Sequence, residues 1–208
     1  MISPKEFLHS IIWTKRHILG ELDVVELKYI RKYIKNNDIC LDIGAHAGSW
    51  AIPLSKITYK GHVYGFEALP YYANILKTMV RYMNRRNITI VNNAILDKNC
   101  SIPIINKDQK GNELTGYTHI KGAHEDSDIS IIVNGITIDS FIEDHSVRQV
   151  GLIKCDVEGA ELLVLRGAKN TIQKWRPIVF CEIVDEYCGR YGYSSHDIFD
   201  FFGNYNYN

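Results

Sequence analysis

Three acidic residues, each at or beside the end of a short apolar run, could bind a cationic or hydroxyl-bearing ligand. Asp42 lies in the run ICLDI before a glycine turn, Glu67 follows VYGF, and Asp156 follows GLIKC. The carboxyl ends of parallel strands meet at one edge of an open α/β sheet, and ligands bind there. We therefore expect the three carboxylates along one rim of such a sheet.

The turn after Asp42 reads GAHAG, with glycines at positions 44 and 48. Glycines let the backbone approach a ligand closely, and amides at a helix N-terminus donate to polar groups. The dinucleotide fingerprint G-x-G-x-x-G requires glycine where His46 stands, which disfavours a pyrophosphate. Asp42 would also repel phosphates and attract an ammonium group. An ordinary strand-turn-helix junction is the alternative explanation of this turn.

Glu67 lies about 20 residues beyond the glycine turn, the distance at which an acidic residue commonly accepts hydrogen bonds from ribose hydroxyls. It also precedes Pro70, so a charge favoured by a helix dipole is the alternative. Together with the turn, it favours a nucleoside ligand without phosphates.

The segment DVEGAE carries three carboxylates around Gly159. Glu161 is expected to stabilise the start of the next helix. Asp156 is the first candidate for a general base, and Glu182, which closes the run IVFC, is the second. Asp156, Glu158 and Glu182 could together bind Mg²⁺, but no Asp-Asn pair accompanies them, so no metal is predicted.

Alternating strands and helices must position these residues. Strands are predicted at 39–43, 63–66, 88–91, 150–155 and 178–184, and helices at 49–59, 71–86, 160–175 and 196–202. The alternation indicates an α/β fold of the Rossmann-like type with a mostly parallel sheet. Two helices in residues 4–37 predict an N-terminal helical cap (1–37) before one domain (38–208). The C-terminal sheet edge is expected to be abbreviated.

The stretch from Cys100 to Val133 departs from this alternation. β-branched runs at 101–105 and 129–133 predict an inserted β-hairpin. The intervening segment, 108–128, is longer than most loops in compact domains, and such loops are often functional. We expect it to face the acceptor, with His119 as a candidate contact.

Composition excludes several classes of function. Lys plus Arg and Asp plus Glu both number 24, so the formal charge is zero and no nucleic-acid partner is expected. The basic stretch 81–86 is interpreted as a solvated helix end. The five cysteines have neither disulfide nor metal spacing, and no run reaches the roughly 20 apolar residues of a membrane span. These features predict a soluble cytoplasmic protein, and they carry no signal for its oligomeric state.

The motifs together resemble one enzyme family. DIGAHAG, GFEALP, NNAILD, TIDSF, LIKCDVEGAELLVLRGA and RPIVFCEI look like the FkbM family of S-adenosylmethionine-dependent methyltransferases. The resemblance covers residues 38 to about 184. It implies a class I methyltransferase fold. Members of this family usually methylate hydroxyls of sugars, glycolipids or polyketide-like natural products. His46 stands where the family often has Asn.

The resemblance also implies roles for individual residues. The turn with Asp42 would hold the methionine end of S-adenosylmethionine, Glu67 its ribose, and the segment 93–97 its adenine, while Asp156 would face the methyl group. The predicted cofactor contacts are Asp42, Gly44, Ala45, His46, Gly48, Glu67, Ala68, Asn93, Ala94 and Asp97. The predicted catalytic residues are Asp156 and Glu182, and the predicted contacts of a small-molecule or glycan acceptor are Lys154, Glu158 and His119.

Two other functions stay open at this point. A nicotinamide-dependent oxidoreductase would use Glu67 in the same way, although the turn glycines differ and no Tyr-x-x-x-Lys pair is evident. A non-catalytic nucleoside-binding module of the same fold is the second alternative.

Overall fold

The computed structural model describes residues 2–22, 24–106, 119–121 and 130–207. The chain divides into two compact units, which are described separately. The first unit contains residues 1–92, 149–154 and 177–179, and the second contains 93–148, 155–176 and 180–208. Among the described residues, no helix is long and apolar enough to cross a membrane. The cap at 1–37 and the domain at 38–208 stay a prediction.

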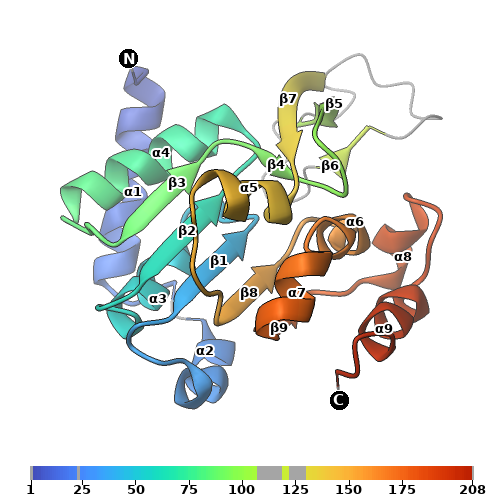
Figure 1. The fold of residues 1–208 in the computed structure, drawn as a ribbon. Helices are drawn as coiled ribbons and strands as arrows, with labels where there is room; N and C mark the ends of the chain where they lie inside the picture. Colours follow the sequence, from blue (N-terminus) through green and yellow to red (C-terminus); the bar gives the residue numbers. More distant parts are fainter. Residues whose placement is uncertain (1, 23, 107–118, 122–129, 208) are drawn as a thin grey trace. The chain divides into compact units, whose positions relative to one another are not determined.

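A five-stranded sheet contains the strands of the first unit, and the last residues of two of its strands, β8 and β9, belong to the second unit (Figure 1). Its strands are β1 (Ile39–Ile43), β2 (His62–Phe66), β3 (Ile88–Val91), β8 (Leu152–Cys155) and β9 (Ile178–Cys181). Their order is β3-β2-β1-β8-β9, and β1, β2 and β3 pair in parallel. The chain therefore builds outward from β1 and then returns to its other side. The point where the order reverses, between β1 and β8, is where open α/β sheets bind ligands.

The strand predictions for this sheet are confirmed with small shifts at the ends. β1 and β3 have the predicted bounds, β2 begins one residue earlier, β8 begins two residues later, and β9 ends three residues earlier. All of β8 and all of β1 except Ile39 are buried. Strands covered on both faces read as continuous apolar runs, which is the pattern that identified them.

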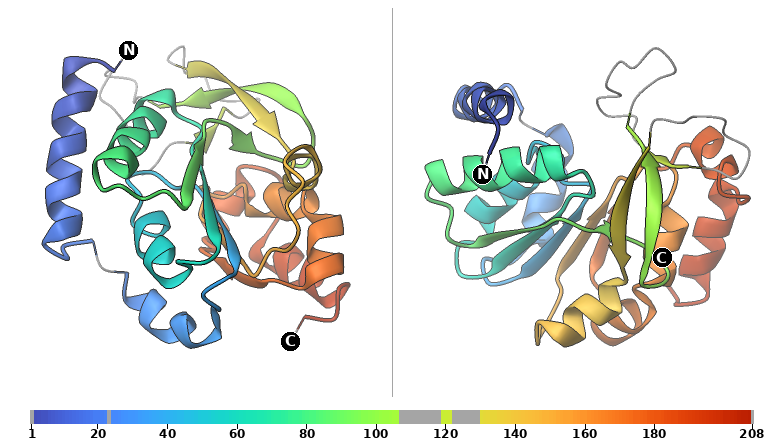
Figure 2. Two further views of the ribbon diagram at one scale, coloured as in Figure 1. Left: turned by 60° about the vertical axis from the view of Figure 1, so that its left-hand side comes forward. Right: turned by 90° about the horizontal axis from the view of Figure 1, so that it is seen from above.

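Helices of the first unit are α1 (Pro4–Ile18), α2 (Val25–Ile30), the 3-10 turn η1 (Arg31–Tyr33), α3 (Ala51–Ile57) and α4 (Pro70–Tyr82). A capping box between Ser3 and Glu6 begins α1, with Pro4 at the first helical position. Helix α1 packs on α4, and Figures 1 and 2 show that the two helices cross. The two predicted N-terminal helices are present, but Phe7, Ile11 and Ile12, whose spacing predicted the first, are exposed.

The second unit contains a four-stranded sheet of order β4-β7-β5-β6. Its strands are β4 (Ala94–Ile95), β5 (Cys100–Ile105), β6 (His119–Ile120) and β7 (Ser130–Ile136). β5 and β7 are antiparallel along their length, from Cys100 opposite Gly135 to Ile105 opposite Ser130. The predicted inserted hairpin is therefore confirmed. Of the segment 108–128, only 119–121 belongs to the described residues.

Helices of this unit are α5 (Ile138–Asp144), α6 (Glu161–Arg166), α7 (Lys169–Trp175), α8 (Asp185–Gly189) and α9 (Ser195–Gly203). The prediction of one helix over 160–175 is wrong, because α6 and α7 are separate. At Gly167 the backbone passes so close to Leu96 that a Cβ atom would lie 2.0 Å from the Leu96 carbonyl oxygen. The Asp139 carboxylate then accepts from the amides of Asn170 and Thr171, which caps the start of α7.

Candidate functional site

The turn after β1 has a backbone conformation that few residues adopt. Gly44, His46 and Gly48 have φ angles of +78°, +42° and +81°. Histidine enters this left-handed region more readily than most non-glycine residues. The amides of Gly44 and Ala45 both donate to the Phe66 carbonyl oxygen, at 3.0 and 2.9 Å. The turn is therefore held at the end of β2, immediately beside Glu67.

The Glu67 carboxylate connects this turn to the start of α4. Its Oε2 accepts from the His46 amide and its Oε1 from the Leu69 amide, both at 2.9 Å. The Asn92 side chain donates to the carbonyl oxygens of Glu67 and Ala68, at 2.8 and 2.9 Å. Backbone and side chain of Glu67 are thus both held in one orientation.

Burial raises the pKa of Glu67 to about 7. The side chain is only 7% exposed, and Asp42 adds a smaller upward effect. The two amide hydrogen bonds and Lys154 lower the pKa but do not offset the loss of hydration. Each carboxylate oxygen can accept more than one hydrogen bond, so capacity remains after the two amides. The residues present therefore fit the paired hydroxyls of a ribose.

Asp42 and Lys154 form a buried ion pair where the strand order reverses. Lys154 Nζ lies 3.3 Å from Asp42 Oδ1, and the two residues are 3% and 0% exposed. The ammonium group also donates to the Gly44 carbonyl oxygen at 3.0 Å and lies 3.4 Å from that of Ile43. The pair therefore supports the glycine turn from inside the sheet.

This geometry differs from the two roles expected from the sequence. Asp42 was expected to attract a ligand ammonium, but its charge is compensated by Lys154 inside the protein. Lys154 was expected to contact the acceptor, but its ammonium group is buried against the turn. The two side chains lie on neighbouring strands that are far apart in the sequence, so no local sequence pattern indicates that they pair.

Helix α1 contacts the same turn, which the sequence did not indicate. His17 Nε2 lies 2.9 Å from the Ala47 carbonyl oxygen. The His46 ring lies between aromatic rings, with Trp13 edge-on at 5.7 Å and Tyr72 tilted at 4.2 Å between centroids. A histidine and a tryptophan inside an N-terminal helix carry no signal for such a contact.

The second unit gathers acidic side chains after β8 and β9. Glu182 donates its amide to the Cys155 carbonyl oxygen at 3.0 Å, which brings Glu182 beside the residue preceding Asp156. Glu158 has a left-handed backbone, with φ of +56°. Burial raises the pKa of Glu158 to about 7, and the charges of Asp156, Glu182 and Glu161 add to the rise, while Arg190 opposes it.

Glu161 stands at the start of α6 but bonds the turn before it, and no side-chain hydrogen bond caps this helix. Glu161 is 1% exposed, and its Oε1 accepts from the amides of Val157 and Gly159, at 3.0 and 3.2 Å. The Tyr193 hydroxyl donates to the Gly159 carbonyl oxygen and accepts from the Leu162 amide. These bonds hold the turn that carries Glu158.

The other predicted site residues also belong to the second unit. The Asn93 side chain donates to the Asn134 carbonyl oxygen at 3.2 Å, Ala94 is buried, and Asp97 is exposed. His119 is partly exposed in β6, opposite Ile105. In the part of the chain that the structure describes, no group of three His, Cys, Asp or Glu residues could hold a metal ion.

Comparisons with known proteins agree with this architecture. The model of the methyltransferase FkbM domain family matches residues 42–208. The hexuronic acid methyltransferase AglP of Haloferax volcanii is 26% identical over 165 residues, which are 78% of this chain and 62% of that protein. This chain thus spans less than two thirds of that relative.

Two solved structures share the fold. The FkbM methyltransferase of Methylobacillus flagellatus KT has a TM-score of 0.55 and 17% identity, over 83% of this chain and 37% of that chain. The precorrin-6y C5,15-methyltransferase of Geobacter metallireducens GS-15 has a TM-score of 0.52 and 12% identity, over 88% and 70%.

The mostly parallel sheet flanked by helices is thus a Rossmann-like class I methyltransferase fold. The family match also supports S-adenosylmethionine as the cofactor predicted from the sequence. Because the family model covers most of the chain, from Asp42 to the last residue, this chain belongs to the methyltransferase FkbM domain family.

Proposed function

We propose that this chain is an S-adenosylmethionine-dependent methyltransferase that methylates a hydroxyl group of a sugar or glycan. The observation that carries the proposal is the Glu67 carboxylate, which the glycine turn and the start of α4 hold in one orientation beside the reversal of strand order. A preorganised acceptor of two hydroxyl hydrogen bonds at this position suits a nucleoside.

The first unit would bind the cofactor. Glu67 would accept from the ribose hydroxyls, and the backbone of the turn 44–48 would hold the methionine end. The Asp42–Lys154 pair would act by positioning, since it supports that turn from within the sheet. When bound, S-adenosylmethionine supplies a methyl group on a sulfonium, which an oxygen nucleophile displaces in line.

The second unit would supply the base. An alcohol must lose its proton as it attacks, and a base is most effective when its pKa lies near the working pH. Glu158, with a pKa of about 7, meets that condition. Asp156 and Glu182 are the candidates predicted from the sequence, and their negative charges help to keep the pKa of Glu158 high. A positioned carboxylate of this kind contributes roughly 10² to 10⁴ in rate.

A carbohydrate acceptor is supported by the relative from Haloferax volcanii, which is a hexuronic acid methyltransferase. The acidic side chains Asp156, Glu158 and Glu182 of the second unit suit a hydroxylated acceptor, because carboxylates accept hydrogen bonds from sugar hydroxyls. We retain Glu158 and His119 as proposed acceptor contacts.

Calorimetric titration with S-adenosylhomocysteine, and separately with NADH, tests the cofactor assignment. We expect binding of the first and none of the second, and the reverse result would identify a nicotinamide-dependent oxidoreductase. A screen of sugars and glycans with isotopically labelled S-adenosylmethionine then tests the acceptor. Tight S-adenosylhomocysteine binding without transfer to any hydroxylated acceptor would instead identify a non-catalytic nucleoside-binding module.

A further inference from the structure

Helix α1 turns its polar side toward the protein and its apolar side outward. The buried residues of α1 are Glu6, Ser10 and His17, of which Glu6 accepts from the Asn74 side chain at 2.9 Å and His17 contacts the Ala47 carbonyl oxygen. The outer face of α1 consists of large exposed apolar residues at helical spacing, namely Phe7, Leu8, Ile11, Ile12, Ile18 and Leu19. A contiguous exposed apolar face marks an interaction surface.

The two helices α1 and α4 and the residues that follow them are rich in basic residues. The segments 4–19 and 70–86, which contain α1 and α4, carry seven basic residues and one acidic residue, whereas the whole chain has no net charge. The one acidic residue is Glu6, on the buried side of α1. The two segments therefore carry six more basic than acidic residues (seven against one), although Arg16 pairs with Glu21, just beyond α1, at 3.4 Å.

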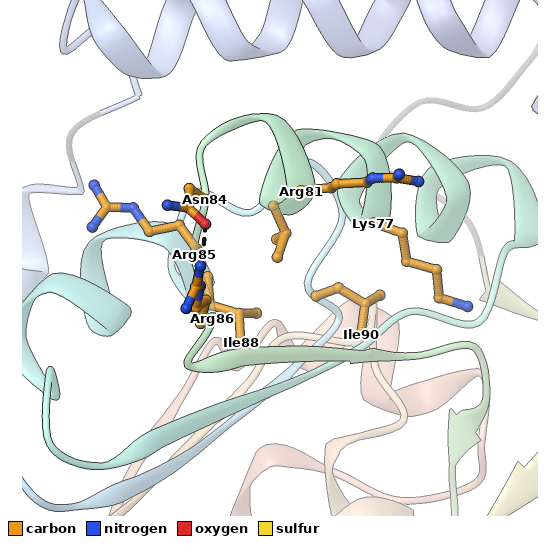
Figure 3. A pocket seen from close by; sticks show the side chains of 8 residues that line it. Lys77, Arg81, Asn84, Arg85, Arg86, Ile88 and Ile90 are labelled. Atoms are coloured by element: carbon orange, nitrogen blue, oxygen red, sulfur yellow. Dashed lines mark hydrogen bonds between the residues drawn. The ribbon is translucent and has the colours of Figure 1, made fainter.

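The cationic end of α4 also forms an open cavity of about 360 Å³ against β3 (Figure 3). Its lining includes Lys77, Arg81, Arg85 and Arg86 above an apolar floor. The Nε atom of Arg85 is buried and has no hydrogen-bond partner among the described residues. The exposed side chains of Lys77, Arg81 and Arg86 at the open cavity would pair with anionic oxygens.

The cationic end of α4 and the outer face of α1 are continuous. Tyr82, at the end of α4, is exposed and lies edge-on to Phe7, with ring centroids 6.3 Å apart. The two helices are in contact where they cross. One surface therefore combines apolar side chains, aromatic rings and cations, which is the composition of helices that lie in a lipid interface.

We propose that the outer face of α1 and the cationic end of α4 bind the surface of an anionic bilayer. Lipid phosphates would pair with the cations of α4 while the apolar side chains of α1 enter the boundary of the acyl chains. A second copy of the chain suits this surface less well, because a two-fold interface would set each basic face against its own copy. The inference does not rest on the proposed enzymatic activity.

Co-sedimentation with lipid vesicles tests the proposal. The wild-type chain should bind vesicles containing about one third phosphatidylglycerol and should bind pure phosphatidylcholine much more weakly, since each basic residue near an anionic surface strengthens binding about fivefold. Lys77→Gln with Arg81→Gln should therefore weaken binding to the anionic vesicles roughly 25-fold. High salt should also weaken the binding of the wild-type chain to anionic vesicles, because it screens the charges.

Ile11→Ser with Ile18→Ser should weaken vesicle binding at least about tenfold, because two apolar side chains no longer enter the interface. The matched control is Ile132→Ser, at an isoleucine in β7 of the second unit that is 69% exposed, against 48% for Ile11 and 73% for Ile18, and it should bind as the wild type does. Circular dichroism and S-adenosylhomocysteine affinity should be unchanged in both variants.

Failure of the folded wild-type chain to bind anionic vesicles would overturn the proposal. So would a dimer, measured by light scattering, that dissociates in the Ile11→Ser, Ile18→Ser variant, because the occupant would then be a second copy. Vesicle binding without any S-adenosylhomocysteine binding would leave this inference intact and reject the proposed function.

Discussion

Lys154 and Asp42 face each other inside the sheet, with Nζ 3.3 Å from Oδ1 and almost no solvent contact for either side chain. Two opposite charges in a poorly hydrated interior are stable only together, because each alone would keep its desolvation penalty. Since Lys154 also donates to the Gly44 carbonyl oxygen, the stability of the sheet and the shape of the glycine turn depend on the same ammonium group.

Replacing Lys154 with methionine keeps the volume and leaves the Asp42 charge uncompensated. The free energy of unfolding should fall by about 3–5 kcal/mol, measured by urea denaturation. Lys98→Met, at an exposed lysine, is the matched control and should change stability by less than about 0.5 kcal/mol. Adding Asp42→Asn to Lys154→Met should recover part of the loss, and a purely additive double variant would argue against the pair.

Glu67→Ala should weaken S-adenosylhomocysteine binding at least about a hundredfold, because two hydrogen bonds to a charged group are lost. Isothermal calorimetry measures this directly. Glu143→Ala, at an exposed carboxylate in α5, should bind with wild-type affinity. Unchanged affinity in the Glu67 variant would contradict the assignment of the ribose contact.

The raised pKa of Glu67 also predicts a pH dependence of stability. The folded protein protonates this carboxyl at about pH 7, against an ordinary value of 4.5. Between these values the folded chain keeps a proton that the unfolded chain releases, so stability falls as pH rises through this window and the penalty is complete above pH 7. The resulting decrease in the free energy of unfolding amounts to about 3 kcal/mol.

The Glu67→Gln variant has no titrating group at this position, so the loss of stability with rising pH that Glu67 causes should be absent from it. Urea denaturation of both proteins between pH 4.5 and 7.5 should show the variant gaining stability relative to the wild type as pH rises. A constant difference between the two curves would mean that the Glu67 carboxyl does not titrate in this range.

The neighbouring carboxylates Asp156, Glu158 and Glu182 of the second unit predict a pH-rate profile. The value of kcat/KM should rise with pH and reach its plateau above about 7, where Glu158 is ionised. Asp156→Asn removes one neighbouring negative charge, lowers the pKa of Glu158, and should move the profile to lower pH. Glu158→Gln should retain S-adenosylhomocysteine binding and lose roughly 10² to 10⁴ in transfer rate.

The same pair of variants distinguishes the two bases. If Asp156 is the base, Asp156→Asn will abolish transfer without shifting any profile, and Glu158→Gln will stay active. S-adenosylhomocysteine affinity serves as the control in both cases, because neither carboxylate is assigned to the cofactor.

Several elements could be predicted because their signals are local. β1 and β3 are short apolar runs bounded by polar residues or glycine, and the structure keeps both predicted ranges. The break between α6 and α7 falls at Gly167, a residue type that commonly ends helices, but the close approach of Leu96 to this glycine is visible only in the tertiary structure. The orientation of α1 escaped prediction for a related reason. Helical spacing identifies an apolar face, but not whether the fold covers it.

The sequence by itself determined the order of strands and helices, the glycine turn, and the position of Glu67 and Asp156 directly after strands. These features follow from the periodicity of apolar residues and from the residue types at neighbouring positions, both of which are local signals. Only the tertiary structure decided that Asp42 is compensated by Lys154, that Glu67 titrates near neutral pH, and that Glu158 lies among like charges. Burial and charge pairing arise from contacts between distant segments, which local patterns do not encode.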